Sequence, residues 1–196
     1  MALLLLAAGQ SRRMRGRDKL LEPVAGKALL RRSAEAALGA RAARVFVVLP
    51  PGAGERRAVL AGLDIEEVTA EDAVEGMAAS LRAGLAAAAP DADAVIVALA
   101  DMPEVTAESY DALIAAYAPE DGAEICRSVS AAGEAGHPVL FGQRFFESLA
   151  ALTGDRGARS VLKDAADFVV DVELAGDAAV LDLDTPEEWA AYRARG

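Results

Sequence analysis

Five short runs of continuous apolar residues constrain the fold of this chain most strongly. Each is long enough for a β-strand and too short to cross a bilayer. They are apolar throughout and do not alternate with polar residues, which is typical of strands buried on both faces of a parallel sheet. The runs are ALLLLAA (2–8), RVFVVLP (44–50), DAVIVALAD (93–101), DFVVDV (167–172) and AAVLDLD (178–184).

Helical patterns separate these runs. The segment 106–118 opens on Thr106, a favourable N-cap, and Thr185 with Glu188 has the spacing of a capping box. Alternating strands and helices predict one α/β domain spanning residues 1–196. We expect a three-layer α/β/α sandwich with a mostly parallel, Rossmann-like sheet. The predicted helices are KALLRRSAEAALG (27–39), GMAASLRAGLAAAA (76–89), TAESYDALIAAYA (106–118), GARSVLKD (157–164) and TPEEWAAYRARG (185–196).

The N-terminal run does not have the order of a secretion signal, because its positive charges follow the apolar core. With only one cysteine, Cys126, and no other long apolar run, we expect a cytoplasmic protein without a membrane partner. The net charge of −11 argues against a nucleic-acid partner. Residues 1–32 nevertheless hold eight cations and two acids, a local charge of +6. This concentration predicts a local anion site.

In open α/β sheets, ligands bind beyond the carboxyl ends of the strands. After the first run comes LAAGQSRRMRGRDKLL (6–21), whose small residues allow close approach of the backbone to a ligand. Its N–H groups could cradle phosphates, with Arg13 and Lys19 neutralising their charge. The segment has neither the P-loop nor the dinucleotide-binding glycine pattern, so an ordinary solvated basic loop is the alternative.

Carboxylates follow two other predicted strands. Asp101 lies in ALADMP (98–103), where it could bind Mg²⁺ or simply end the strand in a turn. Asp182 and Asp184 precede the last predicted helix, and one of them could complete the metal site. Alternatively, they only favour the positive end of that helix.

Three smaller features complete the set of candidates. Glu75, Gly76 and Ser80 surround a predicted helix start, where polar groups could contact a base. His137, in GHPVLF, is the only histidine and lacks a partner at the spacing of a catalytic triad or a zinc site. GDRGAR (154–159) is a glycine-rich basic segment that suits either a second anion or a plain turn.

Taken together, these motifs resemble the molybdopterin nucleotidyltransferases, in particular the molybdenum cofactor cytidylyltransferases with the MobA-like NTP transferase fold. The resemblance covers nearly the whole chain. It rests on the ordered set LAAGQSRRM, DKLL, GMAASLRAGL, ADMP, GHPVLF, GDRGAR and DLDTPEEW.

The resemblance implies a nucleotide-diphospho-sugar transferase type of sandwich that binds a nucleoside triphosphate and Mg²⁺, with Mn²⁺ as an alternative. It assigns catalysis to Arg13, Lys19 and Asp101, and metal binding to Asp101 and Asp182, with Asp184 as an alternative register. The implied nucleotide contacts are Leu6, Ala7, Ala8, Gly9, Ser11, Arg13, Lys19, Gly76 and Ser80. The implied acceptor contacts are His137, Pro138, Arg156 and Arg159.

The implied reaction transfers CMP from CTP to the terminal phosphate of molybdopterin or the molybdenum cofactor and releases pyrophosphate. The LAAG sequence resembles the cytidylyl branch, since the guanylyl branch typically has L-A-G-G. A molybdoenzyme or its maturation chaperone would be a further partner. Alternatives are GTP, ATP or a sugar-phosphate acceptor, or a non-catalytic cofactor chaperone. One departure is that Lys19 follows Met14 by five positions, where the family usually has four.

Overall fold

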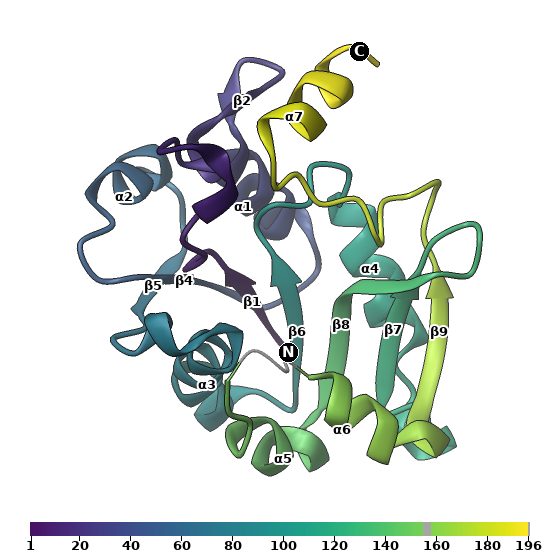
Figure 1. The fold of residues 1–196 in the computed structure, drawn as a ribbon. Coiled ribbons are helices and arrows are strands. Elements are labelled where there is room, and N and C mark those ends of the chain that lie inside the picture. The colour runs from purple at the N-terminus through teal and green to yellow at the C-terminus, as the bar shows by residue number, and fades with distance from the viewer. Residues whose placement is uncertain (155–157, 196) are drawn as a thin grey trace.

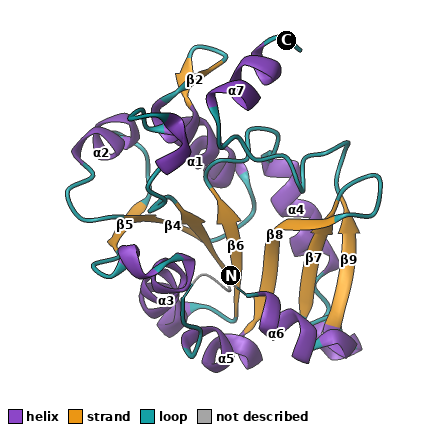
Figure 2. Ribbon diagram, viewed as in Figure 1, coloured by secondary structure: helices purple, strands orange, loops and turns teal. Residues whose placement is uncertain are grey.

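One twisted sheet organises the molecule, and helices cover both of its faces (Figures 1 and 2). The computed structural model describes residues 1–154 and 158–195. Within them, no helix has the length and apolar character required to cross a membrane. The strands, in their order across the sheet, are β5 (Glu66–Thr69), β4 (Arg44–Leu49), β1 (Ala2–Leu6), β6 (Ala94–Leu99), β8 (Ala135–Gly142), β7 (Ile125–Val129) and β9 (Val169–Glu173).

The sheet is mostly parallel, as predicted, and β8 is the strand that runs against its neighbours β6 and β7. A small antiparallel pair, β2 (Pro23–Val24) and β3 (Lys27–Ala28), precedes the first helix. The helices are α1 (Leu29–Gly39), α2 (Gly54–Leu60), α3 (Met77–Ala88), α4 (Ala107–Ala116), α5 (Phe146–Ala150), α6 (Arg159–Asp164) and α7 (Pro186–Arg193).

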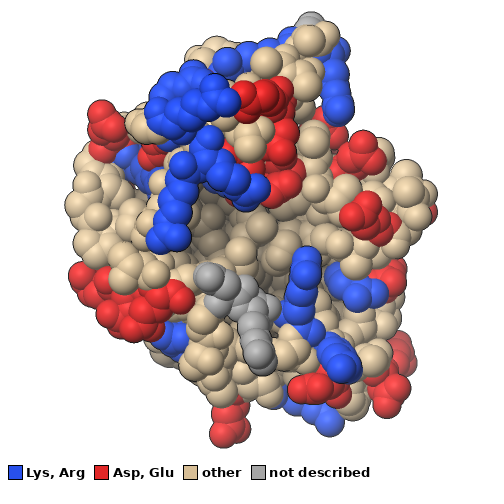
Figure 3. All heavy atoms as spheres, in the orientation of Figure 1, with Lys and Arg blue, Asp and Glu red and all other residues tan. Residues whose placement is uncertain are grey.

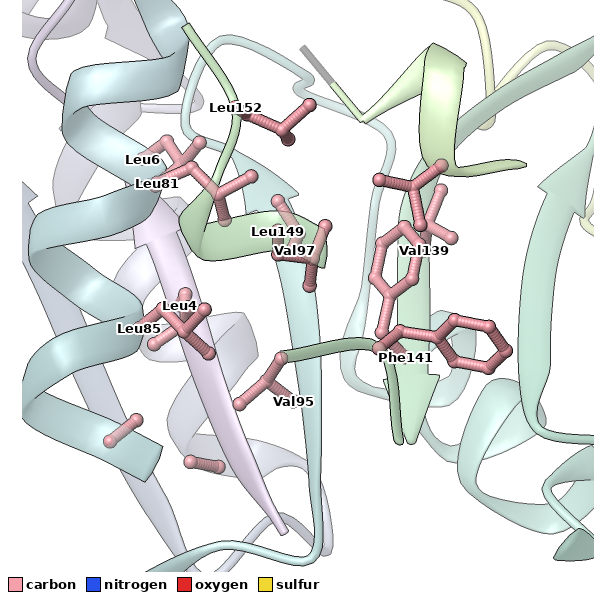
Figure 4. Close-up of a cluster of buried hydrophobic side chains, with 14 of the residues drawn as sticks. Leu4, Leu6, Leu81, Leu85, Val95, Val97, Val139, Phe141, Leu149 and Leu152 are labelled. Carbon is pink, nitrogen blue, oxygen red and sulfur yellow. The ribbon is translucent and has the colours of Figure 1, made fainter. Parts of the chain in front are cut away.

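Two apolar layers, one on each face of the sheet, hold these elements together. Strand residues alternate between the faces, so β1 sends Leu4 and Leu6 to one side and Leu3 and Leu5 to the other. Figure 4 shows Leu4 and Leu6 facing the α3 side chains on the first side. Helices α1 and α4 cover the second side. The expected three-layer sandwich is therefore confirmed.

Four of the five predicted strands are present, but the prediction for 178–184 is wrong. That segment forms turns followed by an irregular extended stretch. Its backbone bonds go to separate partners rather than to one ladder: the His137 N–H donates to the Ala179 carbonyl, and the Leu183 N–H donates to the Asp101 carbonyl. Strands β5, β7 and β8 were missed, because charged residues, glycine or proline interrupt their apolar runs.

Both predicted N-terminal caps form. Thr106 caps the N-terminus of α4, and Thr185 and Glu188 make a reciprocal capping box at α7. Helix α1 begins at Leu29 instead of residue 27, because Lys27 pairs with Val24 across the tight turn at Ala25 and Gly26. Helices α2 and α5 were not predicted.

Candidate active site

A cleft of about 380 Å³ opens at the carboxyl ends of β1 and β6. Leu6 and Leu99, which are register partners on these strands, form part of its lining. Figure 3 shows the hollow with Lys and Arg side chains along one rim. The residues lining it are Leu6, Ala8, Gly9, Gln10, Ser11, Arg12, Arg13, Lys19, Leu20, Ala73, Val74, Gly76, Met77, Ser80, Leu99, Asp101 and Asp184.

The N-terminal loop (residues 7–18) is anchored by a buried methionine. The loop forms a short 3₁₀ helix at Arg12–Met14, and Met14 is fully buried among the side chains of Leu29, Leu183 and Trp189. The apolar contact joins the loop to helix α7 at the C-terminal end of the chain. The loop therefore depends on residues about 170 positions away in the sequence.

The segment between Met14 and Lys19, which is one residue longer than the usual family spacing, contains a left-handed turn. Arg15 has φ 53° and Gly16 has φ 87°. The turn directs Arg15 to Glu187 on α7, at 2.6 Å, and Arg17 lies 3.1 Å from Glu22. Arg15 and Arg17 thus form ion pairs outside the cleft, whereas Lys19 lines it.

Lys19 is the buried cation of the site. Its Nζ donates to Asp101 Oδ2 and to Asp184 Oδ1, and only 8% of the residue is exposed. Burial lowers the pKa of the ammonium group, but the charges and hydrogen bonds of the two carboxylates outweigh burial, so this pKa lies above its usual value. Lys19 is therefore positively charged at neutral pH.

Three carboxylates from two distant segments lie close together, and two of them, Asp101 and Asp184, line the cleft. The bond from Leu183 N–H to the Asp101 carbonyl, 3.2 Å long, holds segment 181–184 beside the end of β6. As a result, one oxygen each of Asp101, Asp182 and Asp184 lie within 4.8 Å of one another. Partial desolvation of the Asp182 carboxyl by the surrounding protein atoms, followed by the charges of Asp184 and Asp101, raises its pKa.

The cluster fits a divalent cation. Carboxylate oxygens are the ligands that Mg²⁺ and Mn²⁺ prefer. Asp101 Oδ1 is buried and has no hydrogen-bond partner in the described part of the chain. A buried anionic oxygen without a partner is costly, and a bound cation would satisfy it.

Most of the predicted nucleotide contacts lie together in the cleft. They are Leu6, Ala8, Gly9, Ser11, Arg13, Lys19, Gly76 and Ser80, and the predicted metal ligand Asp101 lies in the cleft with them. Ala7 is the exception: its side chain packs in the core on the α1 side of the sheet. Of the two alternative metal residues, Asp184 lines the cleft and pairs with Lys19 and Arg13, whereas Asp182 is exposed at the edge of the cluster.

The predicted acceptor contacts that the structure describes lie outside this cleft. His137 and Pro138 are on β8, where burial lowers the pKa of His137 and its Nδ1 has no partner among the described residues. Arg159 begins α6 and is exposed. Arg156 lies outside the residues that the structure describes.

Gly136 allows β8 to pass beside the segment that carries the aspartates. A Cβ atom at this position would lie 1.8 Å from the Ala179 carbonyl oxygen. We expect Gly136→Ala to lower the free energy of unfolding by about 1–3 kcal/mol or more, because backbone on both sides must move. Urea titration measures the change. Gly54→Ala is the control, since its Cβ meets nothing within 4 Å; equal effects of the two substitutions would contradict this expectation.

Sequence reasoning missed several residues. Val74 and Met77 form an exposed apolar lip of the cleft. Arg56, from α2, reaches the N-terminal loop from behind. No sequence signal distinguishes Arg56 from its neighbour Arg57, because only the packing of α2 decides which of the two points inward.

The mostly parallel sheet carries a cation-rich loop, a cleft and a carboxylate cluster at its carboxyl edge. This combination is typical of nucleotidyltransferases. Residues 3–169 match the MobA-like NTP transferase domain. The chain belongs to this family and is a nucleotidyltransferase.

The chain matches several relatives over almost its full length. The chain is 32% identical to the purine catabolism protein PucB of Bacillus subtilis, covering 96% of this chain and 93% of PucB. It is 29% identical to the nicotine blue oxidoreductase of Paenarthrobacter nicotinovorans, covering 94% and 92%. The crystal structure of Rv0371c from Mycobacterium tuberculosis H37Rv superimposes with a TM-score of 0.84 at 30% identity, covering 97% of this chain and 95% of Rv0371c.

Proposed function

We propose that this protein transfers CMP from CTP to the terminal phosphate of molybdopterin or its molybdenum-bearing form, using Mg²⁺ and releasing pyrophosphate. The observation that carries the proposal is the meeting of Lys19, Arg13, Asp101 and Asp184 at one end of the cleft. The product would pass to a molybdoenzyme or its maturation chaperone. The LAAG loop sequence supports cytosine as the base.

In the proposed reaction, an acceptor phosphate oxygen attacks the α-phosphorus of CTP in line. A new P–O bond forms as the bond from the α-phosphorus to the bridging oxygen of the β-phosphate breaks, and pyrophosphate leaves with that electron pair. The acceptor phosphate is ionised near neutral pH, so no general base is required. The residues of the site therefore act by alignment and charge neutralisation.

Lys19 and Arg13 are the residues that would bind the triphosphate. Both now pair with Asp184, so they would exchange carboxylate oxygens for phosphate oxygens when the nucleotide enters. Asp101 and Asp184 would hold the divalent cation, which neutralises phosphate charge when bound. A manganese complex of Rv0371c, 27% identical with a TM-score of 0.80, supports a divalent metal in this family.

The base and acceptor are tested by a substrate panel. The purified protein is incubated with Mg²⁺ and CTP, GTP, ATP or UTP, each with molybdopterin or a sugar 1-phosphate, and the products are identified by mass spectrometry. We expect the cytidylylated pterin and pyrophosphate only with CTP and molybdopterin. A product with another nucleotide or acceptor would contradict that specificity. CTP binding without pyrophosphate release from any acceptor would favour a cofactor chaperone.

One relative is named an oxidoreductase, so the protein is also assayed for hydride transfer. Oxidation of NADH or NADPH by the protein, followed at 340 nm with an electron-accepting dye, should be absent. Robust hydride transfer together with an inactive substrate panel would overturn the proposed function.

The choice of metal ligand is tested by comparing two aspartates. We expect Asp184→Asn to weaken Mn²⁺ binding at least about tenfold, because it removes a charged oxygen that faces the cleft. Asp182→Asn should have a smaller effect, since Asp182 lies at the exposed edge of the cluster. Electron paramagnetic resonance of free Mn²⁺ measures both affinities without requiring turnover. A larger loss in Asp182→Asn would reverse the assignment.

A further inference from the structure

Arg56 is a buried cation that lies outside the cleft yet contacts the back of the N-terminal loop. It projects from α2, which lies beside the loop in Figure 1, and is 6% exposed. Its guanidinium donates to the carbonyl oxygens of Ala7 and Gly9, the latter at 2.7 Å. It also donates to both carboxylate oxygens of Asp18, at 2.7 and 3.0 Å.

The two carbonyl contacts orient the loop backbone. In a planar trans peptide, the N–H points opposite to the carbonyl of the preceding residue. Because the Ala7 and Gly9 carbonyls face Arg56, the N–H groups of Ala8 and Gln10 point away from it, and both of these residues line the cleft. No backbone carbonyl in the described part of the chain accepts from either N–H. Both donors are thus available to an anion in the cleft.

The contact with Asp18 extends the effect of Arg56 to Lys19. Asp18 Oδ1 accepts from the Leu20 N–H at 3.0 Å and from Ser11 Oγ at 3.1 Å, and Ser11 Oγ in turn accepts from the Lys19 N–H at 3.2 Å. These bonds fix the start of the short helix Lys19–Leu21. One guanidinium therefore holds two parts of the site that are ten residues apart, the loop backbone and the base of Lys19.

We propose that Arg56 is a positioning residue, which holds the loop N–H groups and Lys19 in the arrangement that receives the nucleotide triphosphate. Only a guanidinium has enough donors, in a planar fork, to bind two carbonyls and a carboxylate at once. Lysine would keep the charge but lose that geometry. The proposal rests on the proposed function only for the identity of the anion, since the ordering of the loop by Arg56 is a separate property.

The test compares Arg56→Met, Arg56→Lys and the neighbouring control Arg57→Met. Arg57 lies on the same helix but pairs with Glu67 and Thr69, away from the loop. Amide hydrogen exchange is followed by mass spectrometry in fragments covering residues 7–21 and 94–99, without nucleotide. Binding of CTP with Mg²⁺, and of inorganic tripolyphosphate, is measured by titration calorimetry.

In Arg56→Met we expect exchange in 7–21 to accelerate at least about tenfold, with little change in 94–99, and affinity for both anions to fall at least about tenfold. The exchange rate and the anion affinities of Arg56→Lys should lie between those of Arg56→Met and wild type. Arg57→Met should match wild type in both properties. If Arg56→Met does not fold, the partial loss in Arg56→Lys carries the test.

Unchanged exchange in 7–21, or equal acceleration in both fragments, would overturn the positioning role. Failure of the wild type to bind CTP would count against the proposed function instead, because the exchange measurement requires no nucleotide. The proposal would also be overturned if Arg56→Met exchanged faster in 7–21 but bound both anions as tightly as wild type. The ordering of the loop would then make no contribution to anion binding.

Discussion

Asp101→Asn is expected to reduce pyrophosphate release about 100-fold or more while leaving the fold intact. The substitution keeps the size of the side chain but removes the negative charge that faces Lys19 and the other two aspartates. A neutral amide is a poorer ligand for a divalent cation. Less cationic charge would therefore be held beside the phosphates. Initial rates with CTP and molybdopterin, measured by a coupled pyrophosphate assay, give the effect.

Asp171→Asn is the matched control for Asp101→Asn. Asp171 lies on β9 and pairs with the side chain of Arg127 at the surface, away from the cleft. The Asp171→Asn variant should retain wild-type turnover, and thermal unfolding should confirm that both variants are folded. Turnover by Asp101→Asn within a few-fold of wild type would refute a central role for this carboxylate.

Trp189→Ala is expected to produce the largest loss of stability, about 3–5 kcal/mol in the free energy of unfolding. Trp189 is 1% exposed and fills the small core that Met14, Val24, Leu29 and Leu183 complete. Removing the indole leaves a cavity between helix α7 and the N-terminal loop. Urea unfolding, followed by far-ultraviolet circular dichroism, measures the change.

The same substitution should also weaken nucleotide binding, because Met14 anchors the loop that lines the cleft. Trp189→Phe is the matched variant, since it restores most of the apolar volume and should recover most of both properties. If Trp189→Ala retained wild-type stability and CTP affinity, helix α7 would not be the anchor of the loop.

The strands that the sequence predicted correctly are those whose signal is local. Continuous apolar runs identify β1, β4 and β6 because these strands are buried on both faces, and their shared direction brings the residues beyond their carboxyl ends to one edge of the sheet. The caps of α4 and α7 were predictable for the same reason, since each capping box involves only residues three apart. The cations after β1 and Asp101 after β6 were thus recognisable as candidates for one site, whereas Asp182 and Asp184 were assigned to it through a predicted strand that does not form.

The elements that sequence reasoning missed depend on distant partners. Strand β8 contains Gly136 and Pro138, which weaken its local signal, and the neighbouring strands β6 and β7 stabilise it. Segment 178–184 has the composition of a strand, but its N–H and carbonyl groups bond to His137 and Asp101 instead of to a neighbouring strand. Tertiary hydrogen bonding overrides local preference at both places.

By itself, the sequence indicated an α/β sheet, four of its strands, and a cation-rich loop and a carboxylate beyond the carboxyl ends of β1 and β6, because burial and charge are properties of short segments. Only the tertiary structure decided that Asp184 pairs with Lys19 and that Asp182 lies at the exposed edge of the cluster. It likewise decided that Arg56, and not Arg57, holds the loop. These choices depend on which side chains meet across α2, the loop and the C-terminal segment, and such long-range packing leaves no local pattern in the chain.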